Sequence, residues 1–318
     1  MTTTTTTTTA LTTTQARTAQ AIVNLFETSR VLGDYGKVTL IDGDTGHLTF
    51  GRSQTTLGSG NLHGLVERYC RNAGARFGPR LAAWLPRIKA LDFGLDADKK
   101  LHNVLRASAD DPVMRETQDV FFDETYFQPA MRTAGRFGIQ TPLGRAVVYD
   151  SYVHGSWGRI RDQVAGTPAT RGEQAWIADY VKARRHWLAT NGRADLRATV
   201  YRMDAFQRLI DQGFWGLELP LVVRGQEISA LSLNGLPEGC YDGPAPGSRV
   251  IEVSASASLP RGLDVRLVQL GLSDRGVAVT ADGVFGRTSA NLVRDWQRSQ
   301  GLPATGIADV GLIMALTA

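Results

Sequence analysis

Apolar residues recur at helical spacing through the first two thirds of the chain. Ala19, Ile22, Val23 and Phe26 occupy positions i, i+3, i+4 and i+7 of a first helix, and the threonines before them suit an N-cap. The same spacing predicts further helices over residues 61–73, 79–91, 96–107, 111–123, 142–154, 172–190 and 196–212. The pattern therefore predicts a mainly α fold.

One segment near the start departs from this pattern. Residues 37–41 and 47–50 are rich in β-branched and apolar side chains, and they flank a turn of Gly and Asp at 42–46. Such a sequence is typical of a β-hairpin. We therefore expect a mainly α (α+β) domain that contains one small hairpin.

The composition of the chain changes after residue 223. Helical periodicity fades there, and Gly, Pro and Ser accumulate up to residue 260. Apolar helical spacing then returns on either side of an Asp-Gly turn, which predicts a compact domain of about three helices. We expect a disordered Thr-rich tail over 1–14, a large domain over 15–223, a linker over 224–260 and a small domain over 261–318.

Composition excludes several classes of protein. The 318 residues are 42% hydrophobic and contain no uninterrupted apolar run long enough to cross a membrane, so we expect no membrane insertion. Cys70 and Cys240 are too few for a disulfide scaffold, and the five histidines show no metal-binding spacing. We therefore expect neither a metal nor an organic cofactor.

Charge says little about a partner. The 35 Lys and Arg against 31 Asp and Glu give a net charge of +4, and the arginines are spread among carboxylates from Arg17 to Arg298. Nucleic-acid binders usually gather their basic residues into one stripe, so we expect no nucleic-acid partner. We also expect a monomer.

The first residues do not form a secretory signal. Eight threonines run from Thr2 to Thr9, with neither a basic start nor an apolar core. We expect the protein to act outside the producing cytoplasm, either secreted or delivered to a cell wall or periplasm, by a route that does not use such a signal.

Three acidic residues near the hairpin suggest acid–base chemistry. Glycoside hydrolysis needs one protonated carboxyl group for the leaving oxygen and one carboxylate on the opposite face of the sugar. Glu27 closes the first helix, while Asp42 and Asp44 lie in the hairpin turn. Helix-end and turn carboxylates are more often simply solvated surface, so the pattern alone leaves both interpretations open.

Further motifs resemble the family 46 chitosanases, which have a lysozyme-like fold. The hairpin segment Asp44–Gly51 is similar to their catalytic hairpin. Four further motifs match in order and spacing: Asp111–Arg115, Gln118, Tyr126–Ala130 and Tyr149–Gly155. The resemblance extends over about two thirds of the chain.

The resemblance implies roles for individual residues. It makes Glu27 the general acid, Asp44 the general base and Thr49 a residue that helps to hold the attacking water. Asp42 remains an alternative to Asp44, because the spacing from Tyr35 differs by one residue from that of the family. The implied mechanism inverts the anomeric centre.

The substrate-binding residues implied by the resemblance are Arg52 and Asn61. The family has an aspartate that binds the amino sugar at the position of Asn61. An amide cannot pair with the ammonium group of chitosan, although it can hydrogen-bond an N-acetyl or hydroxyl group. This departure disfavours chitosan as the substrate.

Two predicted helices carry charges on their apolar faces. Asp150 follows Leu143 and Val147, and Arg184 follows Ile177 and Val181, so both side chains are expected in the core. A buried carboxylate needs a cationic partner, which makes Arg184 the natural choice.

The resemblance implies an Asp-Arg-Arg network beneath the catalytic acid. It consists of Asp150, Arg184 or Arg185, and Arg202, and it would hold Glu27 from behind. A salt bridge that merely fixes helix packing is the other interpretation.

The last domain resembles the peptidoglycan-binding domains of type 1. The matching features are Val268–Leu270, the turn Asp282–Gly286, the pair Trp296 and Gln297, and the pair Gly301 and Leu302, while Ser289 replaces the threonine of the family. Phe285 and Trp296 are also ordinary core residues for such a fold.

Together these features predict an endo-acting glycoside hydrolase of β-1,4-linked amino-sugar glycans. The attached small domain and Asn61 favour bacterial cell-wall peptidoglycan as the substrate, with an antibacterial, wall-degrading role. One alternative is a chitosanase that hydrolyses chitosan. The other is a non-catalytic glycan-binding protein that keeps the fold without turnover.

Overall fold

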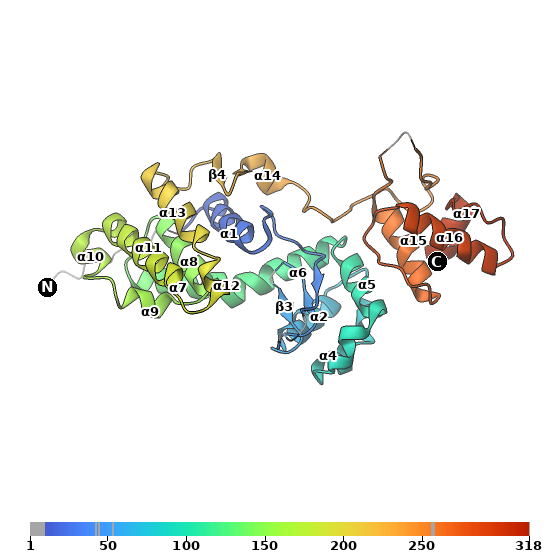
Figure 1. The fold of residues 1–318 in the computed structure, drawn as a ribbon, viewed down its shortest axis with the longest axis horizontal. Coiled ribbons are helices and arrows are strands. Elements are labelled where there is room, and N and C mark those ends of the chain that lie inside the picture. Colours follow the sequence, from blue (N-terminus) through green and yellow to red (C-terminus); the bar gives the residue numbers. More distant parts are fainter. Residues whose placement is uncertain (1–9, 42, 44, 53, 256–257, 318) are drawn as a thin grey trace. The chain divides into compact units, whose positions relative to one another are not determined.

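The computed structural model describes residues 10–41, 43, 45–52, 54–255 and 258–317 (Figure 1). The chain forms two compact units, and each is built from two separate stretches of sequence. Unit 1 contains the residues up to Gly33 together with Phe122–Gly235, and unit 2 contains Asp34–Phe121 together with the residues from Leu236 onward.

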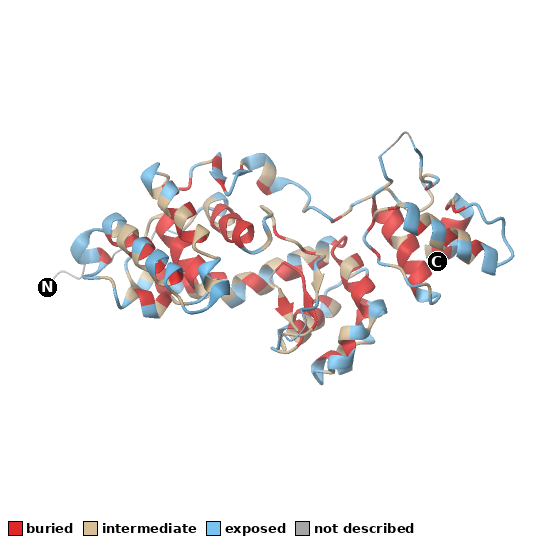
Figure 2. Ribbon diagram, in the orientation of Figure 1, coloured by how far each residue is buried: buried red, intermediate tan, exposed pale blue. Residues whose placement is uncertain are grey.

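Unit 1 is a helical bundle around α8 (Pro142–Val153). Every residue of α8 from Leu143 to Ser151 is buried, and Figure 2 shows the buried positions gathered on this helix and on α1. Thr141 caps α8 by accepting a hydrogen bond from the backbone N–H of Gly144. The helices of this unit are α1 (Thr13–Thr28), α7 (Gln128–Arg136), α8, α9 (Trp157–Arg161), α10 (Pro168–Arg171), α11 (Glu173–Ala189), α12 (Ala194–Arg197), α13 (Tyr201–Asp211) and α14 (Ala230–Asn234).

A small antiparallel sheet lies in unit 2. Its strands are β1 (Val38–Thr39), β2 (Thr49–Phe50) and β3 (Thr55–Thr56), in the order β1-β2-β3. Gly51 follows β2 with a φ of +79°, and a Cβ there would come within 2.4 Å of Gln118 Oε1. The position therefore requires glycine for both its backbone conformation and its space.

The remaining helices of unit 2 follow this sheet in the sequence, and the last three form the C-terminal domain. They are α2 (Asn61–Arg71), α3 (Gly78–Ala82), α4 (Leu85–Lys89), the 3₁₀-helix η1 (Phe93–Ala97), α5 (Lys99–Ser108), α6 (Pro112–Phe122), α15 (Leu263–Asp274), α16 (Arg287–Ser299) and α17 (Val310–Thr317).

The predicted mainly α fold with a small sheet is confirmed, but several boundaries were wrong. The helix expected over 79–91 is divided into α3 and α4, because Pro86 lies in the first turn of α4 and cannot continue a helix from α3. The helix expected over 196–212 is divided into α12 and α13, and between them Thr199 Oγ1 donates to Leu196 O at 2.6 Å.

Other elements were not predicted at all. Helix α7 follows a π-helical turn, η2 (Asp123–Phe127), and contains Pro129 in its first turn, where the missing N–H is tolerated. In the segment from residue 224, expected to be a linker with a little strand structure, β5 (Gln226–Ile228) pairs with β4 (Leu221–Val223), while helix α14 was not predicted.

The C-terminal domain packs against α5 within unit 2. Leu270 of α15 joins the same buried cluster as Leu101, Val104 and Leu105 of α5. Asn103 of α5 donates from Nδ2 to Val279 O at 2.8 Å and accepts from the backbone N–H of Ala281 at 3.0 Å. Apolar and polar contacts thus fix this domain to the helix.

Candidate active site

Glu27 lies on the last turn of α1, where the backbone is held firmly. Ser29 ends the helix in the left-handed conformation, with φ of 59°, and its N–H donates to Leu25 O at 3.2 Å. Tyr201 Oη donates to Phe26 O at 2.8 Å, and Arg224 Nη1 donates to Leu25 O at 3.1 Å. These bonds satisfy carbonyl groups that a helix end leaves without partners.

A buried chain of charges ends at the Glu27 carboxylate. Arg202 Nη2 lies 2.5 Å from Glu27 Oε1, and Arg202 Nη1 lies 2.8 Å from Asp150 Oδ1. The other oxygen of Asp150 lies 2.5 Å from Arg184 Nη1. Asp150 and Arg184 have no exposed side-chain surface, whereas the Glu27 side chain is 33% exposed. Of these four side chains, Glu27 is thus the one that solvent or a ligand can reach.

The charges of this network stabilise one another. Burial by itself would raise the pKa of Asp150, but Arg184 and Arg202 outweigh it and hold that pKa below its ordinary value. Burial would likewise lower the pKa of Arg202, and the carboxylates of Asp150 and Glu27 reverse this and raise it. Arg202 therefore remains charged, as a rigid support for Glu27 requires.

The structure distinguishes Arg184 from Arg185. Arg184 also donates from Nε to Ser156 Oγ at 3.1 Å and from Nη2 to Gly155 O at 3.3 Å, so its guanidinium is fully engaged. Arg185 is half exposed and pairs with Asp204 at 2.6 Å. Arg184 is therefore the arginine that contacts Asp150.

His154 completes the inner end of the network. Its Nδ1 lies 3.2 Å from Arg184 Nη2, which can donate to it when that ring nitrogen carries no proton. Burial, followed by the positive charge of Arg202, lowers the pKa of His154 to about 4. The imidazole is therefore neutral near pH 7.

A second set of predicted residues lies in unit 2. Thr49, on β2, is buried, and its Oγ1 donates to His47 O at 3.0 Å. Arg52 is also buried, with its guanidinium bonded to Asp119 and its backbone N–H donating to Gln118 Oε1 at 2.8 Å. Gln118 Nε2 donates in turn to Tyr35 O at 3.0 Å, which ties Tyr35 to the segment after β2.

The other predicted site residues are Asn61, Asp42 and Asp44. Asn61 begins α2, where its side chain is exposed. Asp42 and Asp44 lie outside the described residues.

Sequence reasoning missed several contacts that fix these segments. Asp96 accepts from the backbone N–H of Leu48 at 2.8 Å, and its other oxygen lies 2.8 Å from His47 Nδ1. His47 also stacks on Phe93 with ring centroids 3.6 Å apart. Asp119 and Tyr201 were missed as well. No local pattern marks such residues, because their partners lie far away in sequence.

Neither a metal centre nor a membrane segment emerges from the described residues. Among them, no three His, Cys, Asp or Glu side chains are grouped so that they could hold a metal ion. Within the same part of the chain, none of the helices combines the length and apolar character needed to cross a bilayer.

A helix-end glutamate is thus held from behind by buried Arg-Asp-Arg charges in a mainly α fold. The model of glycosyl hydrolase family 46 matches residues 21–221. The chain belongs to this family. It is therefore a glycoside hydrolase that acts on amino-sugar glycans. A second family model, of a peptidoglycan-binding domain, matches residues 261–316.

Individual relatives agree with this assignment. A chitosanase of Bacillus subtilis (strain 168) is 27% identical over 233 residues, which cover 67% of this chain and 83% of that protein. A solved chitosanase mutant from Bacillus subtilis MY002, complexed with 6 GlcN, is 25% identical with a TM-score of 0.58, covering 68% of this chain and 96% of the other.

A third relative is also a chitosanase. The family 46 chitosanase of Gynuella sunshinyii, in complex with chitotetraose, is 27% identical with a TM-score of 0.55, and the match covers 70% of this chain and 99% of the other. These relatives support the chitosanase alternative better than the peptidoglycan hydrolase that Asn61 and the small domain had favoured.

Proposed function

We propose that this protein hydrolyses internal β-1,4 bonds of chitosan, with Glu27 as the general acid. The observation that carries the proposal is the series of buried ion pairs that ends on Glu27 Oε1, in a protein of family 46. Because chitosan is a polymer outside cells, the protein would act outside the producing cytoplasm.

The contact from Arg202 suggests which oxygen of Glu27 carries the proton. Arg202 Nη2 donates to Oε1, so the proton of the acid form belongs on Oε2. As the C1–O bond breaks, that proton passes to the glycosidic oxygen and the leaving sugar departs as an alcohol.

The proposal assigns the second half of the reaction to the hairpin. Asp44 would take a proton from a water molecule as that water attacks C1 from the opposite face, and Asp42 remains the alternative base. Thr49 would help to orient the water. Attack on the opposite face inverts the anomeric centre, and enzymes of this kind keep their two carboxyl groups about 6.5–9.5 Å apart.

Asn61, exposed at the start of α2, would contact the sugars that flank the cleaved bond. Arg52, buried and bonded to Asp119, would support the segment after β2 instead. The amide of Asn61 offers both a donor and an acceptor but no charge, so it favours a neutral N-acetyl or hydroxyl group over an ammonium group. We therefore infer that partly N-acetylated chitosan is cleaved faster than fully deacetylated chitosan.

Peptidoglycan remains a second candidate substrate. Two observations favour it: the domain over residues 261–316 matches a peptidoglycan-binding family, and Asn61 replaces a carboxylate. With this substrate the protein would degrade bacterial cell walls.

Reducing-end release from chitosan and from purified peptidoglycan, measured side by side, tests the proposal. We expect release from chitosan, at a rate that rises with moderate N-acetylation. Release from peptidoglycan alone would establish the second candidate instead. No release from either polymer would contradict both and indicate a non-catalytic binding protein.

A further inference from the structure

The segment Gly239–Pro244 precedes the C-terminal domain and is bonded to its first helix. The backbone N–H of Leu263, the first residue of α15, donates to Gly243 O at 3.0 Å. Arg266, one turn further along α15, donates from Nη2 to Gly239 O. These hydrogen bonds fix both ends of the segment to α15.

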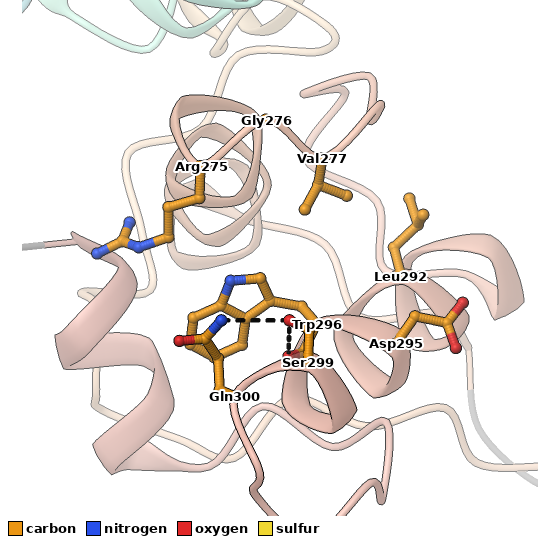
Figure 3. Close-up of a pocket in the computed structure, with 8 residues that line it drawn as sticks. All are labelled: Arg275, Gly276, Val277, Leu292, Asp295, Trp296, Ser299 and Gln300. Atoms are coloured by element: carbon orange, nitrogen blue, oxygen red, sulfur yellow. Dashed lines mark hydrogen bonds between the residues drawn. The ribbon is translucent and has the colours of Figure 1, made fainter.

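The three helices of the C-terminal domain are joined to one another. Arg275, which follows α15, donates from Nη2 to Ala315 O of α17 at 2.6 Å. Figure 3 shows the indole of Trp296, on α16, beside the turn Arg275–Val277. Trp296 and Val277 both pack against the buried cluster of the domain. A segment that is bonded to α15 is therefore supported by the whole packed domain.

The segment Gly239–Pro244 is also bonded to the region where α5 ends and α6 begins. The backbone N–H of Tyr241 donates to Asp110 Oδ1 at 2.8 Å. Next to it, Arg115 Nη2 of α6 lies 3.0 Å from Asp242 Oδ1. Contacts with α15 and with this region thus determine where the side chain of Cys240 lies.

Cys240 contacts the chain that leads into the small sheet. Its side chain is 4% exposed, and it forms one buried cluster with Tyr35 and Ala109. Gly36 lies so close to the end of α5 that a Cβ at this position would be 3.3 Å from Ala109 Cβ. The residues just before β1 therefore pack against both α5 and Cys240.

Tyr35 connects this cluster to the strands of the predicted catalytic hairpin. Its Oη donates to Asp119 Oδ1 at 2.5 Å, and its carbonyl oxygen accepts from Gln118 Nε2 at 3.0 Å. Asp119 and Gln118 in turn bind the guanidinium and the backbone N–H of Arg52. Strand β1 begins shortly after Tyr35 and pairs with β2, which carries Thr49. A displacement of Tyr35 would therefore displace Thr49 as well.

We propose that Cys240 is a positioning residue for hydrolysis and acts through Tyr35 on the hairpin. The inference rests on the proposed function, in which Thr49 helps to orient the attacking water. Because a misplacement of about 1 Å at a reacting group can lower a rate roughly 100-fold, support of the hairpin affects turnover without any contact with the sugar. The C-terminal domain would thereby contribute to the cleavage of soluble oligomers.

Kinetics of the full-length Cys240→Leu variant on soluble chitosan oligomers test the inference. The larger side chain overpacks the buried cluster and displaces Tyr35. At a temperature well below the melting temperature of the variant, we expect kcat to fall at least about tenfold and KM to change less than about twofold. Cys240→Ser keeps the size of the side chain and should retain at least about half of kcat.

Control variants separate positioning from stability. Cys70→Leu introduces the same side chain at the other free cysteine, which lies on α2 outside the cluster, and should keep kcat within about twofold even if its melting temperature falls equally. Tyr35→Phe removes the hydroxyl that binds Asp119 and should also lower kcat. Because Cys240 acts through Tyr35, the double variant should lose less activity than the product of the two single effects. Cys240→Ala replaces Cys240→Leu if the larger side chain prevents folding.

Two results would overturn the inference and leave the proposed function intact. One is a kcat of the Cys240→Leu variant, or of Cys240→Ala in its place, within twofold of that of the unaltered protein. The other is a double variant with Tyr35→Phe in which the two single effects multiply fully.

Hydrogen exchange tests the same support without a substrate. The amides of Gly51 and Arg52 donate to Lys37 O and to Gln118 Oε1, each at 2.8 Å, and should exchange faster in Cys240→Leu than in Cys70→Leu. If the unaltered protein cleaves no oligomer, the proposed function fails, whereas equal exchange in the two variants would contradict the support of the hairpin itself.

Discussion

At the scale of single residues, the network behind Glu27 combines four charges that sum to zero. Arg184 and Arg202 balance Asp150 and Glu27, and the three inner side chains are at most 3% exposed. Buried charges are costly unless they are paired and hydrogen-bonded, and here each inner charge meets this condition. The price is sensitivity to any added charge, and His154 is the group that could supply it.

The pH dependence of stability should report on His154. Its pKa is about 4 in the folded protein and about 6.5 when unfolded, so between these values the unfolded chain binds more protons. The free energy of unfolding should therefore fall as the pH is lowered from about 6.5 to about 4, by about 3 kcal/mol from this residue, and level off below that.

The His154→Gln variant isolates this contribution. Glutamine retains an acceptor for Arg184 but does not titrate. Urea unfolding of both proteins at several pH values should show that the free energy of unfolding of the unaltered protein falls relative to that of the variant as the pH is lowered. A difference that stays constant between pH 4 and pH 7 would contradict the assignment.

Residue-level prediction from the sequence succeeded where a local pattern carried the information. Asp150 and Arg184 interrupt apolar helix faces, so their burial and need for partners could be read from spacing alone. Asp96 could not be found in this way, because its partners His47 and Leu48 lie almost fifty positions earlier in an irregular segment.

At the scale of elements, helices α5 and α15 form a tight joint within unit 2. Arg266 Nε lies 2.9 Å from Asp110 Oδ2, with the side chains 3% and 0% exposed. Arg266 Nη1 also donates to Arg106 O at 3.0 Å, and the backbone N–H of Tyr241 donates to Asp110 Oδ1 at 2.8 Å. The C-terminal domain is thus a structural part of this unit, and its removal would expose buried polar groups.

Arg266→Met should strongly destabilise unit 2. It would leave Asp110 buried without its cation, a change that costs roughly 3–5 kcal/mol and lowers the melting temperature of a unit of this size by about 6–12 °C or more. Differential scanning calorimetry measures the shift. Arg298→Met is the matched control, since that arginine is 65% exposed and should change stability by less than about 1 kcal/mol. Equal small shifts in both variants would contradict a fixed joint.

The contacts between α5 and α15 were not part of the domain organisation expected from the sequence. Fading periodicity and many glycines and prolines between residues 224 and 260 are typical of a linker. Such composition does not reveal that Arg266 and Asn103 will find partners across the joint, because those contacts depend on surfaces formed by distant segments. Helix type and hairpin were predictable from local spacing, whereas packing between elements was not.

At the scale of the whole molecule, a family 46 hydrolase carries a second glycan-binding domain. Membership of the family covers residues 21–221, and the peptidoglycan-binding match covers 261–316. The catalytic proposal concerns the first of these regions, where a carboxylate is held by arginines.

The turnover of Glu27→Gln on soluble chitosan oligomers tests the central claim most directly. The amide keeps the shape and the contact with Arg202 but cannot donate the catalytic proton, so kcat should fall about 10²–10⁴-fold with oligomer binding and melting temperature retained. Glu227→Gln, at an exposed position on β5, should retain full activity as the control. If Glu27→Gln keeps more than a tenth of the activity of the unaltered protein, Glu27 is not the general acid.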